Sequence, residues 1–398
     1  MSLPLQRLHA TTPEDLDYSF DQLDNLMDAA GIDVLIASSK HNVRYLLGGY
    51  EFIFFSAMDA IGHSRYLPLF VYVRGHSDKT VYIANKMEGG EHANHPFWVP
   101  IFKPVSWGSF DAISAAIQHL QSVGVTGNTI GIESGFLPSD AADALRSAYP
   151  DSRLVDATGT LERLRAVKTP REIEFLRKAT ELIGASMRAT MEASRGGDSK
   201  TEIVQRLRAE ETTRGLQFEY CLITLGDSHN RAVSDQTWNQ GEVISLDSGG
   251  NLHGYIGDIC RMGVLGTPDA ELIDLLAEIE ETQQAAFSMI AAGKTGADMI
   301  AHATAIKDVQ PNGHCTDFFA HGMGLISHEA PFLMTNHPVA YEGTDAEKPL
   351  KSGMILSVES TMLHPTRGFI KLEDTVLVEE GHCEVFGKAE RDWICSSP

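Results

Sequence analysis

The sequence has few cysteines, no long apolar run and a deficit of basic residues. Its 398 residues include five cysteines, an odd number without a closely spaced pair, which argues against a disulfide framework and against a thiolate zinc site. No apolar run of about 18 residues occurs, so we expect no transmembrane helix. Acidic residues outnumber basic residues by 54 to 32. This balance argues against a nucleic-acid or anionic-membrane partner, because both attract basic surfaces.

The rest of the composition is that of an ordinary soluble protein. Apolar residues account for 43% of the chain and charged residues for 22%, which excludes the collagen-like, disordered and coiled-coil classes. The N-terminal stretch lacks a basic region followed by an apolar core, so we expect no secretory signal. A reduced, cytoplasmic protein is the simplest interpretation. The acidic excess also favours a site at which a cation holds several carboxylates together.

Helices and strands alternate in the first part of the chain. Thr12-Pro13 is typical of a helix start and Gly31 of a helix end, so we predict a helix over residues 12–31. The pattern predicts a mixed α/β domain over residues 1–160. Its other predicted helices cover 110–123 and 138–150, and its predicted strands cover 32–38, 66–73, 80–85, 129–134 and 153–158.

The second part of the chain begins with two helix-start signals. Thr169 with Glu172, and Ser199 with Glu202, fit capping boxes and predict helices that end near Ser194 and Gly215. Two later helices and several strand-like runs predict an α+β domain over residues 161–398. The later helices cover 268–292 and 295–309, and the strand-like runs cover 219–225, 241–247, 252–265, 353–360 and 369–378.

Four acidic residues lie within apolar, strand-like runs of this second domain. They are Asp247, Asp258, Glu359 and Glu373. A single carboxylate in such a run usually lies on an exposed edge strand. A buried one costs several kcal/mol unless it is paired or bound to a metal. Four in sequence order, together with His321 in HGMG, favour a site where the carboxylates share cations.

The donor types limit the metal chemistry. Two divalent ions bridged by carboxylates lower the pKa of a bound water and polarise a carbonyl oxygen. Ligation that is rich in oxygen and includes one imidazole suits Mn²⁺, Co²⁺, Zn²⁺ or Fe²⁺. We expect two divalent metal ions, with Mn²⁺ as the first choice and the other three left open.

These residues resemble the pita-bread metallopeptidase family, in the branch of Xaa-Pro dipeptidase (prolidase), Xaa-Pro aminopeptidase and creatinase. The segments SLDSG, GYIGDICR, HGMGLISHEAP, SGMILSVES and KLEDTVLV match the family pattern in order. In the first half, HNVRYLLGG (41–49) looks like the strand-entry motif of that branch, and TPREIEFLRKA (169–179) like its linking helix. The resemblance implies an α/β N-terminal creatinase/prolidase-type domain and an α+β C-terminal pita-bread domain.

The resemblance also implies roles for the five clustered residues. Asp247 binds one metal, and Asp258 and Glu373 bridge both metals. His321 and Glu359 complete the coordination of the second metal. Glu359 can also carry the proton of the attacking water as a general base.

Three further residues are candidates for substrate contact. His328, seven residues after His321, matches the family's second histidine, which contacts the scissile amide or the oxyanion; the alternative is a partner of a carboxylate ligand. His229 lies near the family's substrate-binding histidine, although a shifted alignment places Asn230 there and a surface loop residue is the alternative. Lys371 replaces an Arg that prolidases use near the substrate carboxylate; it keeps the charge and loses the bidentate fork.

The resemblance implies a hydrolase that cleaves Xaa-Pro dipeptides or N-terminal Xaa-Pro peptides through a metal-bridging hydroxide. An alternative is a metal-dependent hydrolase or lyase acting on a small non-peptide substrate, such as a small amide. A third is a non-enzymatic protein-recognition module, disfavoured because no metal ligand is lost. We also expect a homodimer, as in that branch, and a polar loop over residues 334–349 that could cover the site.

Overall fold

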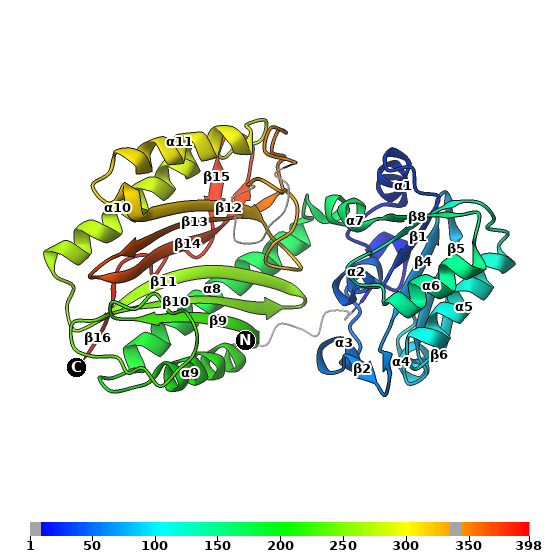
Figure 1. Cartoon of the computed structure of the whole chain (residues 1–398), viewed down its shortest axis with the longest axis horizontal. Coiled ribbons are helices and arrows are strands. Elements are labelled where there is room, and N and C mark those ends of the chain that lie inside the picture. The colour runs from blue at the N-terminus through cyan, green and yellow to red at the C-terminus, as the bar shows by residue number, and fades with distance from the viewer. Residues whose placement is uncertain (1–8, 335–343, 398) are drawn as a thin grey trace. The chain divides into compact units, whose positions relative to one another are not determined.

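The computed structural model describes residues 9–334 and 344–397. The chain forms two compact units, one through Arg165 and the other from Ala166 onward (Figure 1). Most of the polar loop expected over the site falls on residues 335–343, which lie outside the described ranges. Within those ranges, no helix has the length and the apolar character that a membrane span requires.

The first unit contains a mixed six-stranded sheet in the order β6-β5-β4-β1-β7-β8. Strand β1 runs parallel to β7 and antiparallel to β4. The strands of this sheet are β1 (Val34–Ala37), β4 (Leu69–Val73), β5 (His76–Asn85), β6 (Ile101–Ser106), β7 (Thr129–Ile132) and β8 (Arg153–Asp156). A small hairpin, β2 (Ala60–Ile61) and β3 (Ser64–Arg65), lies outside it. The helices are α1 (Phe20–Ala29), α2 (Lys40–Leu46), α3 (Ile53–Ala57), α4 (Glu88–Asn94), α5 (Ser109–Ser122), α6 (Ser139–Ala148) and α7 (Thr158–Arg165).

Most elements predicted for this unit are confirmed, but the first helix is not continuous. A short 3-10 turn covers Pro13–Asp15, and the α-helix begins only after Ser19, whose hydroxyl accepts a hydrogen bond from the Gln22 amide. Two helix-start signals therefore divide the predicted segment. Asp15 accepts from the Thr12 amide at the first, and Ser19 accepts from the Gln22 amide at the second.

The structure differs from the sequence predictions at two further places in this unit. The segment 41–49, which resembles a strand-entry motif, lies mainly in helix α2, which Ser39 caps. Strand β6 was not predicted, because its segment IFKPVS carries a lysine and Pro104. Proline is tolerated in β6 since this strand lies at the edge of the sheet.

The second unit contains an eight-stranded sheet. Its main path is β12-β13-β14-β11-β10-β9, with β15 beside β14 and β16 beside β11. The strands are β9 (Gln217–Leu225), β10 (Val243–Leu252), β11 (Tyr255–Leu265), β12 (Thr316–Gly322), β13 (Ile355–His364), β14 (Gly368–Val378), β15 (Cys383–Val385) and β16 (Ile394–Ser396). The helices are α8 (Pro170–Ala193), α9 (Lys200–Thr213), α10 (Ala270–Met289) and α11 (Gly296–Val309).

Both predicted capping boxes are present. The hydroxyl of Thr169 accepts from the Glu172 amide at the start of α8, and the hydroxyl of Ser199 accepts from the Glu202 amide at the start of α9. Strand β12, which carries His321, was not predicted, because its segment TDFFAHG shows no clear alternation of apolar and polar residues.

Helices α8, α9, α10 and α11 cover one face of this sheet (Figure 1). Leu246 and Ile259 pack in an apolar core with residues of α8 and α9, and Val358 packs in another with residues of α10 and α11. Each of these three side chains is the direct neighbour in sequence of an acidic residue singled out above. Because successive side chains of a strand point to opposite faces, the acidic residues lie on the face that the helices leave uncovered.

Candidate metal centre

The register of four strands brings the acidic residues to one face. Glu359 on β13 pairs directly with Glu373 on β14. Glu373 pairs in turn with Cys260 on β11, and Cys260 pairs with Asp247 on β10. Directly opposed residues share a face, and Asp258 lies two residues before Cys260, so all four carboxylates meet on the same side of the sheet. All four are buried.

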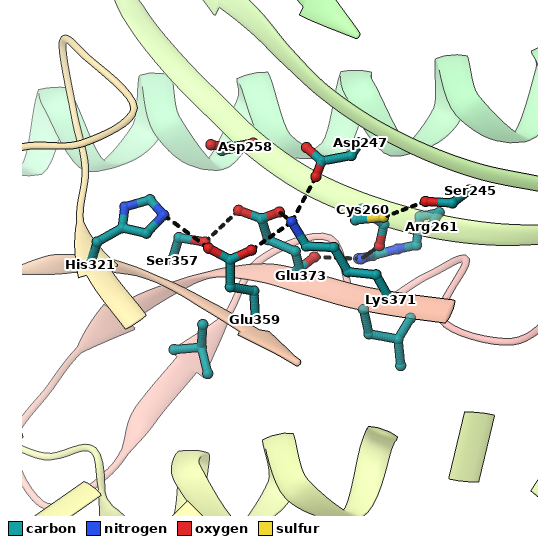
Figure 2. A network of polar contacts seen from close by, with 12 residues as sticks. Ser245, Asp247, Asp258, Cys260, Arg261, His321, Ser357, Glu359, Lys371 and Glu373 are labelled. Carbon is teal, nitrogen blue, oxygen red and sulfur yellow. Dashed lines mark hydrogen bonds and ion pairs between the residues drawn. The ribbon is translucent and has the colours of Figure 1, made fainter. Parts of the chain in front are cut away.

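His321 joins this face from the strand β12. It pairs with Ser357 of β13, two residues before Glu359. The Ser357 hydroxyl donates to Glu373 Oε1 at 2.7 Å, and His321 Nε2 lies 3.5 Å from Glu359 Oε1. Figure 2 shows the imidazole and the carboxylates pointing toward one another.

Three of these residues fit one metal ion. Asp258, His321 and Glu373 each offer one ligand atom, and the three atoms lie within 4.8 Å of one another. Asp258 Oδ1 is buried and has no hydrogen-bond partner among the described residues. Two carboxylate oxygens and an imidazole are donors that suit Mn²⁺, Co²⁺, Zn²⁺ or Fe²⁺.

The pKa values of these carboxylates reflect the crowding of negative charge in the centre. Burial, followed by the charges of Glu373 and Asp247, raises the pKa of Asp258 well above its ordinary value. Burial and then the Glu359 charge raise the pKa of Glu373 to about 7. Both shifts reflect the cost of gathering negative charge in a buried place, and a bound cation offsets that cost.

Lys371 lies inside the carboxylate group. Its Nζ is 2.6 Å from Asp247 Oδ2, 2.5 Å from Glu359 Oε2 and 2.7 Å from Glu373 Oε2 (Figure 2). Burial alone would lower the pKa of Lys371, but these three carboxylates raise it well above its ordinary value. The ammonium group is therefore engaged by the candidate metal ligands themselves. The sequence had suggested instead a place beside a substrate carboxylate.

A second cation, Arg231, was missed in the sequence. Its guanidinium forms an ion pair with Asp247 Oδ2 and lies 5.0 Å from the ring centre of Phe369. The family pattern places a histidine near this position, and no sequence signal marked the arginine beside it. Arg231 lies in the segment between the end of β9 and the start of β10, and the fold of this segment brings it to Asp247.

The structure does not bring His229 into the group. Its side chain is exposed, and one ring nitrogen lies 3.3 Å from the carbonyl oxygen of His364. The alternative position, Asn230, is also exposed, and its backbone carbonyl oxygen accepts from Lys200 Nζ at 2.6 Å.

His328 does reach the centre. Its half-buried ring stacks on that of His321, with ring centres 3.9 Å apart and an interplanar angle of 25°. The turn between them is fastened by the Glu329 amide, which donates to the Gly322 carbonyl oxygen at 2.9 Å. A buried ion pair between Lys168 and Glu329, at 3.0 Å, holds the same turn.

Arg261 supports the centre from the opposite face of the sheet. It is fully buried, and Nη1 donates to the carbonyl oxygens of Cys260 and Glu373 at 2.9 and 2.8 Å. Its Nη2 pairs with Asp374 Oδ1 at 2.8 Å. Arg261 thus ties β11 to β14 at the position where Glu373 enters the centre.

Comparison with known proteins agrees with this architecture. The chain matches the Creatinase/Prolidase N-terminal domain over residues 20–167 and metallopeptidase family M24 over residues 174–380. It is 24% identical to an Xaa-Pro dipeptidase of Pyrococcus furiosus over 380 residues, which cover 94% of this chain and 99% of that relative.

Solved structures show the same fold. An Xaa-Pro dipeptidase from Bacillus anthracis aligns with a TM-score of 0.78 and 21% identity, covering 94% of this chain and 98% of that one. An X-Pro aminopeptidase from Thermotoga maritima aligns with a TM-score of 0.75 and 20% identity, covering 94% of this chain and 100% of that one. The expected fold class, an N-terminal creatinase/prolidase-type domain followed by a pita-bread domain, is confirmed. The recognition-module alternative gains no support, and the chain belongs to metallopeptidase family M24.

Proposed function

We propose that this metallopeptidase cleaves the amide bond of Xaa-Pro dipeptides or of N-terminal Xaa-Pro peptides. The observation that carries the proposal is the buried group of Asp258, His321 and Glu373, whose ligand atoms lie within 4.8 Å of one another. The names of similar proteins, such as Xaa-Pro dipeptidase, support the substrate class.

The residues of the centre divide the chemistry among them. A divalent ion held by Asp258, His321 and Glu373 would supply a lowered pKa for water and polarisation of the scissile carbonyl. Glu359 lies at the edge of this group, between His321 at 3.5 Å and Lys371 at 2.5 Å. A carboxylate at this place can take a proton from the attacking water and pass it to the leaving nitrogen.

His328 is placed to stabilise the negative charge that develops on the substrate carbonyl oxygen. Its ring stacks on His321, and the turn that carries it is fixed by the Lys168–Glu329 ion pair. A fixed imidazole can donate a hydrogen bond to the oxyanion that develops when the carbonyl carbon is attacked. Such preorganised donors lower the barrier because they need no rearrangement during the reaction.

A substrate panel tests the proposal. The Mn²⁺-loaded full chain should hydrolyse Ala-Pro and Gly-Pro faster than dipeptides that lack proline. Hydrolysis of small N-acyl amides without any turnover of Xaa-Pro peptides would contradict it. The same panel addresses the second candidate function, action on a small non-peptide substrate. The exposed position of His229 favours that candidate, because the resemblance implies a substrate-binding histidine near that place.

Three expectations remain part of the proposal. Mn²⁺ is the first choice of metal, with Co²⁺, Zn²⁺ and Fe²⁺ as alternatives that metal reconstitution would rank. We also propose a homodimer, which sedimentation would test, and a cytoplasmic location, which cell fractionation would test.

A further inference from the structure

The ammonium group of Lys371 lies where three carboxylates converge. Its distances to oxygens of Asp247, Glu359 and Glu373 are all 2.7 Å or less. Its side chain is buried, with a relative exposure of 4%. A cation of this kind, in contact with three carboxylates, makes the contacts that a metal ion would otherwise make.

The strand register fixes this placement. Lys371 pairs with Thr361, and Glu373, two residues later, pairs with Glu359. Lys371 and Glu373 therefore share one face of β14. Moving Lys371 to the other face would require a one-residue slip, which would also turn Glu373 away from the centre. The lysine cannot leave the carboxylate face while the ligand set stays intact.

The charges of the buried group point to a limit on the number of ions. Metal ligation requires ionised carboxylates, and in that state the four supply four negative charges, whereas Lys371 and Arg231 supply two positive charges. Two negative charges remain, and one divalent ion balances them. A second divalent ion would add an excess of positive charge in a buried place, which is costly unless a further anion accompanies it.

We infer that Lys371 takes the place of a second metal ion, so that the centre binds one divalent ion, at Asp258, His321 and Glu373. The donor geometry supports this division, because the Asp258 side of the centre has an unpartnered carboxylate oxygen and the Asp247 side is held by two cationic side chains. The inference differs from the two ions that the family resemblance implies. It rests on the proposed function only in requiring an ion at this group.

The metal content of the full chain tests the inference. The protein is stripped with a chelator, reloaded with Mn²⁺ and passed through gel filtration. Elemental mass spectrometry should then find one Mn²⁺ per chain, and electron paramagnetic resonance should show an isolated Mn²⁺ ion. Two ions per chain with a spin-coupled spectrum would overturn the inference and leave the proposed function standing. A protein that binds none of Mn²⁺, Co²⁺, Zn²⁺ and Fe²⁺ would overturn both.

Variants at Lys371 test its part directly. Lys371→Met removes the charge with little change in length and should raise the count from one ion to two. Lys371→Arg should keep one ion. Lys351→Met, at an exposed lysine of the same unit, serves as the matched control and should also keep one ion. A folded Lys371→Met that still binds one ion would overturn the inference. If that variant does not fold, the count and the spectrum of the unaltered chain decide.

Discussion

Glu359 and Glu373 face each other directly across β13 and β14, and the ammonium group of Lys371 contacts both of them, at 2.5 and 2.7 Å. Two carboxylates this close repel each other unless a cation lies between them. The centre is therefore built on a balance of opposite charges on one sheet face. The opposite face is packed against helices.

Asp258→Asn keeps the shape of the side chain and removes its charge. We expect loss of the bound divalent ion and a fall in kcat/KM of more than about 100-fold. Mutation of a residue that only hydrogen-bonds to a metal ligand already costs about 10–100-fold, and loss of a ligand itself should cost more. Elemental mass spectrometry and peptide hydrolysis measure the two effects. Asp317→Asn, at an exposed aspartate of β12, is the control and should change neither. Normal metal content in Asp258→Asn would rule out this residue as a ligand.

His328→Ala should lower kcat by about 100- to 1,000-fold, the usual cost of removing an oxyanion donor. The bound metal should remain, because the proposed ligands are left intact. Steady-state kinetics and metal analysis of the same preparation check both points. His314→Ala, at an exposed histidine of the same unit, should behave like the unaltered chain. A loss of metal together with activity would show that His328 supports the ligands and does not act on the substrate.

Glu211 makes stability depend on pH. Burial raises its pKa from the ordinary value of 4.5 to about 8, although Ser248 donates a hydrogen bond to it. Between these values the folded state holds a proton that the unfolded chain has lost. The contribution of this proton is fully present below pH 4.5 and is lost as the pH rises to about 8. The free energy of unfolding should therefore fall by about 1.4 kcal/mol per pH unit from this residue.

Glu211→Gln removes this titration. In denaturant unfolding from pH 5 to 9, the unaltered chain should lose stability relative to Glu211→Gln up to about pH 8. Above that value the difference should stay constant. Glu347→Gln, at an exposed glutamate of the same unit, is the control. Parallel stability curves for the unaltered chain and Glu211→Gln would show that Glu211 is ionised in the folded protein.

Arg261→Met should lower the free energy of unfolding by about 3 kcal/mol, because it leaves the buried Asp374 with one cation fewer. It also removes the hydrogen bond to the Glu373 carbonyl oxygen. Arg146→Met breaks an exposed pair with Asp143 and should cost no more than about 1 kcal/mol. Chemical denaturation compares the two variants, and equal costs would contradict the buried role of Arg261.

Local sequence patterns predicted the positions of the acidic residues well. Alternation along β13 placed Ser357 and Glu359 on one face, and the structure confirms this, since the Ser357 hydroxyl reaches Glu373. The capping boxes before α8 and α9 were equally local, and both are present. Such signals depend on residues two or three positions apart, so a single segment contains all the information.

The two cations of the centre could not be predicted in the same way. The sequence marks Lys371 only as a replacement for an Arg. Its contacts depend on the pairing of β14 with β13 and on the closeness of β10 to β14, which the sequence does not give. Arg231 reaches Asp247 from sixteen residues away through a loop with no regular pattern. The prediction of one continuous helix over residues 12–31 was wrong for a different reason. Two helix-start signals lie within one apolar pattern, and the sequence alone does not rank them.

The central claim is that a divalent ion at Asp258, His321 and Glu373 is required for cleavage of the amide bond. The most direct test is the rate of Ala-Pro hydrolysis by the full chain, measured before chelation, in excess chelator and after Mn²⁺ is restored. The account predicts that hydrolysis is lost in chelator and returns with the metal. Full hydrolysis in excess chelator, by protein shown to be free of metal, would contradict it.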